Sequence, residues 1–290
     1  MGPSCDCGPG LPKGLVTPMT KILTLVVMML ALVGYGGGQS PVPGLLAPRV
    51  LNAGDYRAPG IPAQFGDTDP HGWTGLTPAH YAVHGIDAAR YNGLIDFAAA
   101  RAAGVQFAWL KATEGGDLLD PGYGLNVLRA REAGVAVGAY HFYYPCRDIA
   151  EQARWFIANV PRVPGDLPPV LDMEWNNHSP SCRLRPPPSQ VRADIETFAR
   201  IVAAHYDTAP VVYVAPDFYQ DNDLGALETV EFWLRAVTDQ PSTRYPGEHW
   251  SFWQYSGTGV VPGVPGQSDL NAFAGDRAAW ELWLAARRQR

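Results

Sequence analysis

From residue 80 onward, short apolar segments alternate with segments whose apolar residues recur at helical spacing. This alternation limits the chain to an α/β architecture, because each helical segment must cover a face of the sheet that its neighbouring strands build. The expected strands of this part are 83–87, 105–113, 135–143, 170–174 and 211–215, and the helices between them are 96–103, 121–132, 148–160 and 189–206.

A weak internal repeat supports this alternation. The tripeptide Ala-Gly-Val occurs at 103–105 and again at 133–135, each time after an expected helix and at the start of an expected strand. The two glycines are 30 residues apart, which is about the length of one strand-plus-helix unit. The repeat therefore indicates successive βα units.

After residue 215 the helical segments fade. Three further strands are expected at 232–237, 250–255 and 268–273, followed by a closing helix at 276–287. Eight strands, of which the first five are joined by helices, predict a TIM-like α/β barrel with five βα units followed by three strands with few helices. An open, doubly wound sheet is the alternative, but no Gly-rich phosphate loop supports a nucleotide-binding version of it.

The chain divides into three regions by composition. Residues 1–38 hold a leader and an apolar run, 22–33, preceded by Lys21 and followed by small residues, which is the pattern of a secretory signal peptide. An uncleaved membrane anchor is the alternative, because no clean Ala-x-Ala site follows the run. Residues 39–78 are interpreted as a Pro/Gly-rich linker and residues 79–290 as the barrel domain. The expected location is periplasmic or extracellular.

Charge and cysteine usage narrow the range of partners. The net charge of −6, with no dense basic tract, argues against a nucleic-acid partner. The four cysteines form no Cys-x-x-Cys motif. His80 and His84 have the i, i+4 spacing of a metal pair but lack a third ligand, and we expect no metal and no cofactor. Cys146 and Cys182 are expected to form a disulfide in an exported protein, with two unpaired loop thiols as the alternative.

The segment 169–175, Pro-Val-Leu-Asp-Met-Glu-Trp, carries the main chemical signal. Alternate side chains of a strand point to the same side, so Asp172 and Glu174 are expected to share one face at the carboxyl end of their strand. Neighbouring carboxylates push their pKa values apart, so that one stays ionised while the other holds a proton. This pair suits acid/base cleavage of a glycosidic bond. The alternative is a buried aspartate satisfied by backbone or arginine beside a solvated glutamate.

Further acids come from other strands. In a barrel the site lies at the carboxyl ends of the strands, near which Asp87 and Asp269 are expected. We therefore expect these two acids to join Asp172 and Glu174 in one catalytic group. Aromatic side chains near the same ends suit a saccharide, because sugar rings stack on aromatic planes, although ordinary packing is the alternative. The predicted substrate-binding residues are Tyr140, His141, Tyr143, Trp175, Gln254, Tyr255 and Asn271.

Five motifs occur in the order seen in one known family. They are Gly-Ile-Asp at 85–87, Phe-Ala-Trp-Leu-Lys-Ala-Thr-Glu-Gly at 107–115, Gly-Ala-Tyr-His-Phe-Tyr at 138–143, Leu-Asp-Met-Glu at 171–174 and Trp-Gln-Tyr at 253–255. Together they resemble glycoside hydrolase family 25, the muramidases often called Chalaropsis-type lysozymes. The resemblance spans about residues 84–273.

The resemblance implies a substrate and a set of roles. It implies hydrolysis of the β-1,4 bond between N-acetylmuramic acid and N-acetylglucosamine in the glycan strands of peptidoglycan. It also implies that Glu174 is the general acid and that Asp172 tunes its proton and helps to orient the N-acetyl group of the substrate. Asp87 and Asp269 are, by the same resemblance, the other acids of the groove.

Two departures from the family pattern bear on substrate preference. Asn92 stands where the first motif usually continues to a Gln, and residues 233–237, Trp-Leu-Arg-Ala-Val, stand where an ending of the Ala-Arg-Tyr type is common. Two other classes of protein are left open. One is a glycan-binding barrel without catalysis. The other is an envelope protein that its apolar N-terminal run holds in the membrane.

Overall fold

The computed structural model describes residues 60–177 and 179–290. The predicted signal peptide or anchor, and the predicted linker up to residue 59, lie outside the described residues. Within the two described ranges, no helix is both long enough and apolar enough to cross a membrane.

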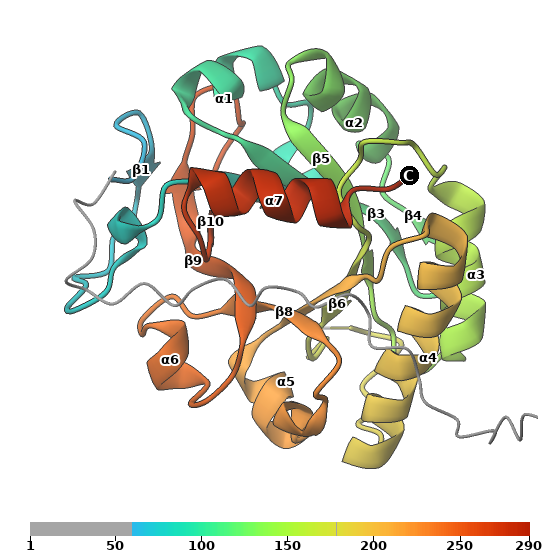
Figure 1. Ribbon diagram of the computed structural model, residues 1–290. Coiled ribbons are helices and arrows are strands. Elements are labelled where there is room, and N and C mark those ends of the chain that lie inside the picture. Colours follow the sequence, from blue (N-terminus) through green and yellow to red (C-terminus); the bar gives the residue numbers. More distant parts are fainter. Residues whose placement is uncertain (1–59, 178) are drawn as a thin grey trace, which may run out of the picture. The chain divides into compact units, whose positions relative to one another are not determined.

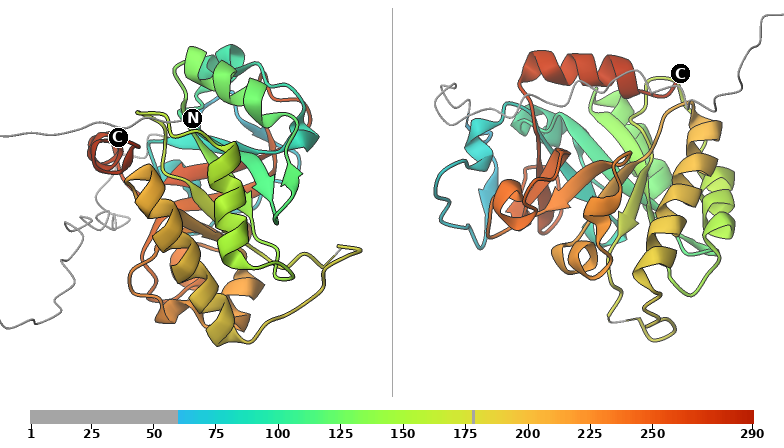
Figure 2. Two further views of the ribbon diagram at one scale, coloured as in Figure 1. Left: turned by 90° about the vertical axis from the view of Figure 1, so that its right-hand side faces the viewer. Right: turned by 60° about the horizontal axis from the view of Figure 1, so that its bottom comes forward.

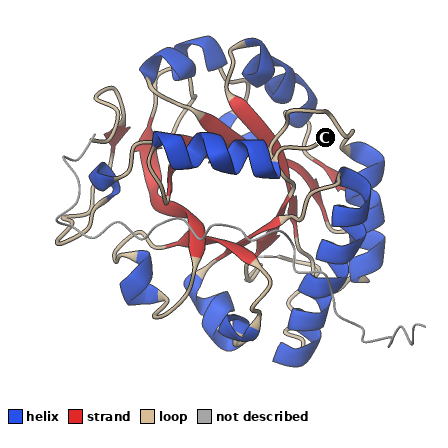
Figure 3. Cartoon of the chain, viewed as in Figure 1, coloured by secondary structure: helices blue, strands red, loops and turns tan. Residues whose placement is uncertain are grey.

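Eight strands close into a barrel, which confirms the predicted TIM-like α/β fold (Figure 3). Neighbouring strands from β2 round to β8 are parallel, β10 is antiparallel to both β2 and β9, and a parallel pairing of β8 with β9 closes the ring. The barrel strands are β2 (His84–Ala88), β3 (Phe107–Glu114), β5 (Ala136–Phe142), β6 (Val170–Met173), β7 (Val211–Val214), β8 (Glu231–Arg235), β9 (Trp250–Val260) and β10 (Ser268–Phe273).

Helices cover the outside of the barrel, and their ends follow the chemistry of the sequence. Asp96 and Asp148 cap the first and third helices by accepting hydrogen bonds from backbone N–H groups. Gly104 ends the first helix with a φ of 119°, a conformation that favours glycine. The helices of this layer are α1 (Phe97–Ala103), α2 (Tyr123–Glu132), α3 (Ile149–Asn159), α4 (Pro188–Tyr206), α5 (Pro216–Asp221) and α6 (Pro241–Arg244), with 3-10 turns at Pro78–His80, Arg90–Asn92 and Leu224–Ala226.

The described part of the predicted linker packs against the barrel. The two-residue strand β1 (Gly66–Asp67) pairs with β9 in antiparallel fashion. The Trp73 ring lies edge-on to Trp253, with 5.0 Å between the ring centroids. A second short strand, β4 (Leu118–Leu119), pairs with the end of β3 and is not part of the ring. Residues 60–78 therefore extend one wall of the barrel.

Aromatic side chains fill the barrel interior. Alternate residues of each strand point inward, and Trp109 and Trp233 meet there in a stacked pair with 4.9 Å between their centroids. Gly138 makes room for this pair, because a Cβ atom at that position would lie 2.6 Å from the Trp109 indole nitrogen. The opposite phase of each strand packs against the helices in a separate hydrophobic layer.

One helix closes the amino end of the barrel. Helix α7 (Arg277–Arg287) lies across that end, and Trp280 and Trp283 pack against Phe252 and Phe273 of the interior (Figure 1). The long connection between β6 and α4 projects from the opposite end (Figure 2). Access to the interior is therefore from the carboxyl ends of the strands.

Candidate active site

A pocket of about 190 Å³ opens at the carboxyl end of the barrel. All four acids of the predicted catalytic group line it. Three of them lie on different strands, and Glu174 directly follows β6. Strand phase explains this, since each acid occupies an inward-pointing position at or near the end of its strand. The lining residues are Asp87, Tyr140, Asp172, Glu174, Tyr213, Trp233, Arg235, Gln254 and Asp269.

Asp172 is the more enclosed acid of the central pair. Its side chain is 8% exposed, and its Oδ1 atom has no hydrogen-bond partner among the described residues. Burial raises the pKa of Asp172 well above its usual range, the charge of Glu174 raises it further, and Lys111 acts in the opposite direction. Asp172 therefore favours its protonated form.

Glu174 follows the last residue of β6 and is half-buried at the mouth of the pocket. Burial raises its pKa, while the positive charges of Arg235 and then Lys111 oppose that rise. The carboxyl group can therefore hold a proton near the surface of the pocket, where a bound substrate can receive it.

Asp87 and Asp269 face each other across the antiparallel pair of β2 and β10. Burial raises the pKa of Asp87, but hydrogen bonds from Asn271 and then Gln254 oppose that rise, because both donate to its Oδ1 atom at 2.7 and 3.1 Å. Burial, the charge of Asp87 and a hydrogen bond to it raise the pKa of Asp269 to about 9. Asp269 thus keeps the proton that the two share, and Asp87 is the carboxylate.

Two aromatic donors fix the amides that hold Asp87. The Tyr213 hydroxyl donates to Gln254 Oε1 at 2.9 Å, and the Trp233 indole N–H donates to Asn271 Oδ1 at 2.8 Å. With each amide oxygen taken in this way, each amide turns its NH₂ group toward Asp87. The network therefore presents Asp87 with two donors, which favours its ionised form.

Three of the predicted substrate-binding residues lie outside the pocket. His141, Tyr143 and Tyr255 point outward, between the strands and the helices, and are 0%, 0% and 4% exposed. Tyr140 and Gln254, the residues just before two of them, line the pocket instead. The physical reason is strand alternation, which sends adjacent side chains to opposite faces. The expected role of these three residues in substrate binding therefore has no support in the geometry.

Trp175 is also turned away from the pocket lining. Its ring packs on Phe218 at 4.4 Å between centroids, and the Arg185 guanidinium lies over it at 4.4 Å. The indole N–H donates to Asp221 at 2.9 Å. The Arg185 guanidinium thus covers one face of the Trp175 ring.

Asn271 also lies outside the pocket lining, where its side-chain amide donates a hydrogen bond to Asp87.

The sequence motifs did not identify three of the pocket residues. Tyr213, Trp233 and Arg235 reach the pocket from β7 and β8. The alternation of side chains along a strand could have identified two of them, because Trp233 and Arg235 are two residues apart and share the inward face. Arg235 lies in the segment that departs from the family ending.

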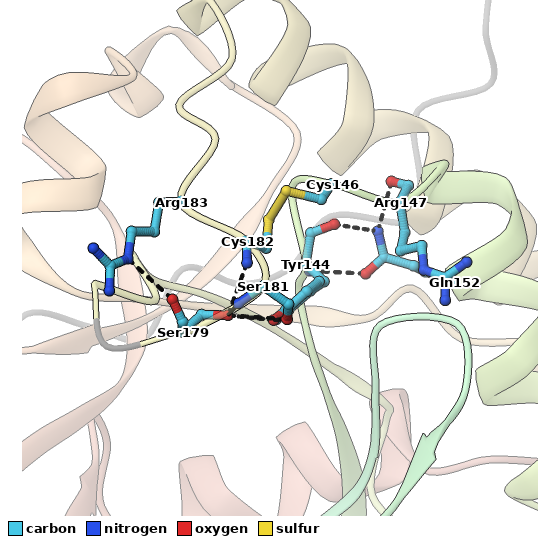
Figure 4. The surroundings of a disulfide bond; sticks show 8 residues. All are labelled: Tyr144, Cys146, Arg147, Gln152, Ser179, Ser181, Cys182 and Arg183. Atoms are coloured by element: carbon cyan, nitrogen blue, oxygen red, sulfur yellow. Dashed lines mark hydrogen bonds between the residues drawn. A yellow bond between two sulfur atoms is a disulfide. The ribbon is translucent and has the colours of Figure 1, made fainter.

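A disulfide joins two of the connections that follow the barrel strands (Figure 4). Cys146 belongs to the connection between β5 and α3, Cys182 to that between β6 and α4, and their Cα atoms are 5.8 Å apart. Beside it, the Tyr144 hydroxyl is hydrogen-bonded to Ser179 and, at 2.8 Å, to Ser181. These bonds tie the long β6–α4 connection to its neighbour.

Histidine and acid side chains in the described ranges form no group of three or more arranged to hold a metal ion. The His80 ring bonds locally to Thr77, and the His84 ring bonds to the carbonyl of Tyr81 and the hydroxyl of Tyr255. Both histidines therefore act as hydrogen-bonding groups of the fold.

The closed α/β barrel, with carboxyl groups from separate strands in one pocket, defines a barrel of the glycoside hydrolase class. The chain belongs to the glycosyl hydrolases family 25, whose family model matches residues 86–264. Lysozyme M1 of Streptomyces globisporus is 34% identical over 207 residues, which cover 68% of this chain and 69% of that protein. A protein from Escherichia coli K12, described as "Uncharacterized protein YegX", is 36% identical over 203 residues, covering 68% and 72%.

Solved structures agree with this assignment. A family 25 glycosyl hydrolase from Bacillus anthracis superimposes with a TM-score of 0.66 at 28% identity, covering 75% of this chain and 98% of that one. A bacterial lysozyme from Streptomyces coelicolor gives a TM-score of 0.62 at 33% identity, covering 71% and 97%. The predicted family and the predicted glycoside hydrolase class are both confirmed.

Proposed function

We propose that this chain is a peptidoglycan hydrolase of the muramidase type, which cleaves the β-1,4 bond between N-acetylmuramic acid and N-acetylglucosamine. The observation that carries the proposal is the gathering of four acids, in unlike environments, around one pocket. Family membership supports it. So do the names of relatives, which include an N,O-diacetylmuramidase of Chalaropsis sp. that is 33% identical over 144 residues.

Glu174 is the proposed general acid. It stands at the mouth of the pocket, and burial favours its protonated form. A protonated carboxyl group in that position can donate to the leaving glycosidic oxygen. Asp172 lies behind it, and its unpartnered Oδ1 atom is the proposed acceptor for the amide N–H of the substrate's N-acetyl group.

Asp87 and Asp269 have a different proposed task. The transition state of glycoside hydrolysis carries positive charge on the sugar ring. Asp87, ionised and held by two amide donors, supplies a fixed negative charge on the other side of the pocket. Asp269 keeps its proton and donates a hydrogen bond to the Asp87 carboxylate.

The proposal includes the cellular setting. Residues 1–38 are proposed to direct export, with residues 79–290 as the hydrolase barrel. Lysozyme relatives act on the cell wall, and the Cys146–Cys182 disulfide suits an oxidising compartment outside the cytoplasm. Peptidoglycan is the proposed partner, and the net charge of −6 does not favour nucleic acid.

Replacement of the proposed acid tests the function. Glu174→Gln keeps the shape of the side chain but removes its proton, so release of reducing ends from purified cell walls should fall at least about 100-fold. Glu228→Gln, at an exposed position outside the pocket, should retain the wild-type rate. Mass spectrometry of the products should identify N-acetylmuramic acid as the new reducing sugar.

The same assay separates the alternative. A glycan-binding barrel would retain wall binding in both the wild-type and Glu174→Gln proteins while neither released reducing ends. That outcome, or a new reducing end of N-acetylglucosamine, would contradict the proposed reaction.

A further inference from the structure

Arg235 is the one cation among the residues that line the pocket. It occupies the last position of β8, in inward phase with Trp233, and lies beside Gln254 of the neighbouring strand β9, the residue that donates to Asp87. The side chain is only half-buried. The segment that contains it, residues 233–237, is the one that departs from the common family ending.

Within residues 60–177 and 179–290, the guanidinium group of Arg235 has no fixed partner. Among the described residues, no hydrogen bond involves its side chain and no carboxylate lies within 4.0 Å of it. Lys111, the other cation near the acids, is already neutralised by an ion pair with Glu114 at 2.7 Å. The positive charge of Arg235 is therefore available to the whole group of acids rather than to one of them.

Gly257 lies next to both Arg235 and Asp269, one of the four acids. A Cβ atom built on Gly257 would lie 3.3 Å from Asp269 Oδ1 and 4.0 Å from Arg235 Nη2. The absent side chain leaves the space between guanidinium and carboxyl group open. An opposite charge at this range favours the ionised form of nearby carboxyl groups without bonding to them.

We propose that Arg235 is a positioning residue for the reaction, which limits the number of protons that the acids of the pocket hold and so sets the upper pH limit of hydrolysis. This inference rests on the proposed function. The titratable and charged groups that face Arg235 or its acids are Asp87 of β2, Lys111 of β3, Tyr140 of β5, Asp172 of β6, Glu174 beyond it, Tyr213 of β7, Asp217 of α5, Tyr245 after α6 and Asp269 of β10.

The sign of the effect follows from the geometry. The general acid works only while it is protonated, so activity falls as pH rises through the pKa of Glu174. Burial raises the pKa of Glu174, and Arg235 is the first group that opposes this rise. Removal of its charge should let Glu174 keep its proton to higher pH. Asp87, which must stay ionised, should likewise require a higher pH, since Arg235 also favours its carboxylate.

The test is a pair of pH–rate profiles on purified cell walls. Arg235→Met should move the falling limb of kcat/KM upward by about one pH unit or more, and Arg235→Lys should restore most of the wild-type profile because it restores the charge. Arg287→Met is the matched control. Arg287 bonds to Glu231 at the amino end of the same strand, so its loss should lower Tm but leave both limbs unmoved.

A second measurement avoids activity altogether. Carbon-13 NMR of the carboxyl groups should show the Glu174 titration moving to higher pH in Arg235→Met. A uniform loss of rate with unmoved limbs and an unmoved Glu174 titration would overturn the inference and leave Arg235 a packing or contact residue. Absence of reducing ends with the wild-type protein would instead overturn the proposed function, so the two failures are distinguishable.

Discussion

The two facing acids of β2 and β10 differ in what their neighbours donate. Asp87 receives two amide N–H groups on one oxygen, whereas Asp269 is favoured as a proton donor by burial and by the charge beside it. Chemically similar side chains thus take opposite roles because of the surrounding amides. In the second pair, by contrast, burial raises the pKa of both Asp172 and Glu174, so the expectation that one of these two stays ionised has no support in the geometry.

At the scale of single residues, Asp269→Asn should change how stability depends on pH. The pKa of Asp269 is raised from 3.8 to about 9 in the folded protein, so its proton stabilises the fold fully below about pH 4, and this contribution is lost as pH rises toward 9. An asparagine donates the same hydrogen bond without titrating. The wild-type Tm should therefore fall more between pH 4 and pH 9 than the Tm of Asp269→Asn.

Asp69→Asn serves as the control, because Asp69 is exposed and lies outside the pocket. Thermal unfolding followed by circular dichroism across this pH range gives the comparison. Parallel Tm curves for wild type and Asp269→Asn would show that Asp269 does not hold the shared proton.

The grouping of acids was predictable from the sequence, but some of their neighbours were not. Asp87 lies near the carboxyl end of β2 and Asp269 near the amino end of the antiparallel strand β10, so the fold alone brings them together. His141 occupies the opposite phase, which the motif did not reveal. Nor could local sequence show that Arg185, ten residues away, covers the Trp175 ring.

At the scale of elements, strand β2 owes its place to one small residue. A Cβ atom at Gly85 would lie 2.4 Å from the backbone oxygen of Phe107 on β3. Backbone atoms of a paired strand cannot move aside cheaply, so β2 and β3 can approach at this level only through a glycine.

Gly85→Ala should therefore lower the free energy of unfolding by roughly 1–3 kcal/mol, as overpacked interiors do. Gly124 is an exposed position of helix α2 with open space around it, so Gly124→Ala should leave the free energy of unfolding unchanged or raise it by up to about 1 kcal/mol. Urea denaturation of both variants measures the difference. Equal stability of the two would mean that the β2–β3 pairing tolerates a side chain.

Element limits show what a periodic pattern can and cannot reveal. The strand expected at 268–273 is β10 with the same limits, and the expected helix starts at Asp96 and Asp148 are caps one residue before α1 and α3. Strand β9 runs to Val260, five residues beyond its predicted end, because its extension pairs with β1 and β10. Strand β1 has two residues, too few to leave a periodic signal.

At the scale of the whole molecule, the disulfide links parts of the barrel that are 36 residues apart in sequence. A cross-link across a loop of that length stabilises a protein by about 2–4 kcal/mol, mainly by restricting the unfolded chain. The double variant Cys146→Ser, Cys182→Ser should therefore have a free energy of unfolding that is lower by that amount, as measured by urea denaturation.

Reductant provides the internal control for this prediction. Dithiothreitol should lower the Tm of the wild-type protein and leave the Tm of the double serine variant unchanged. A wild-type Tm that is insensitive to full reduction, with free thiols verified chemically, would contradict a stabilising role for the cross-link.

Helix α7 covers the amino end of a barrel whose interior is already filled with aromatic side chains. A polymer therefore has no passage through the barrel, and a glycan strand can reach the acids only from the rim at the carboxyl ends of the strands. Both fragments then leave over the same rim by which they arrived.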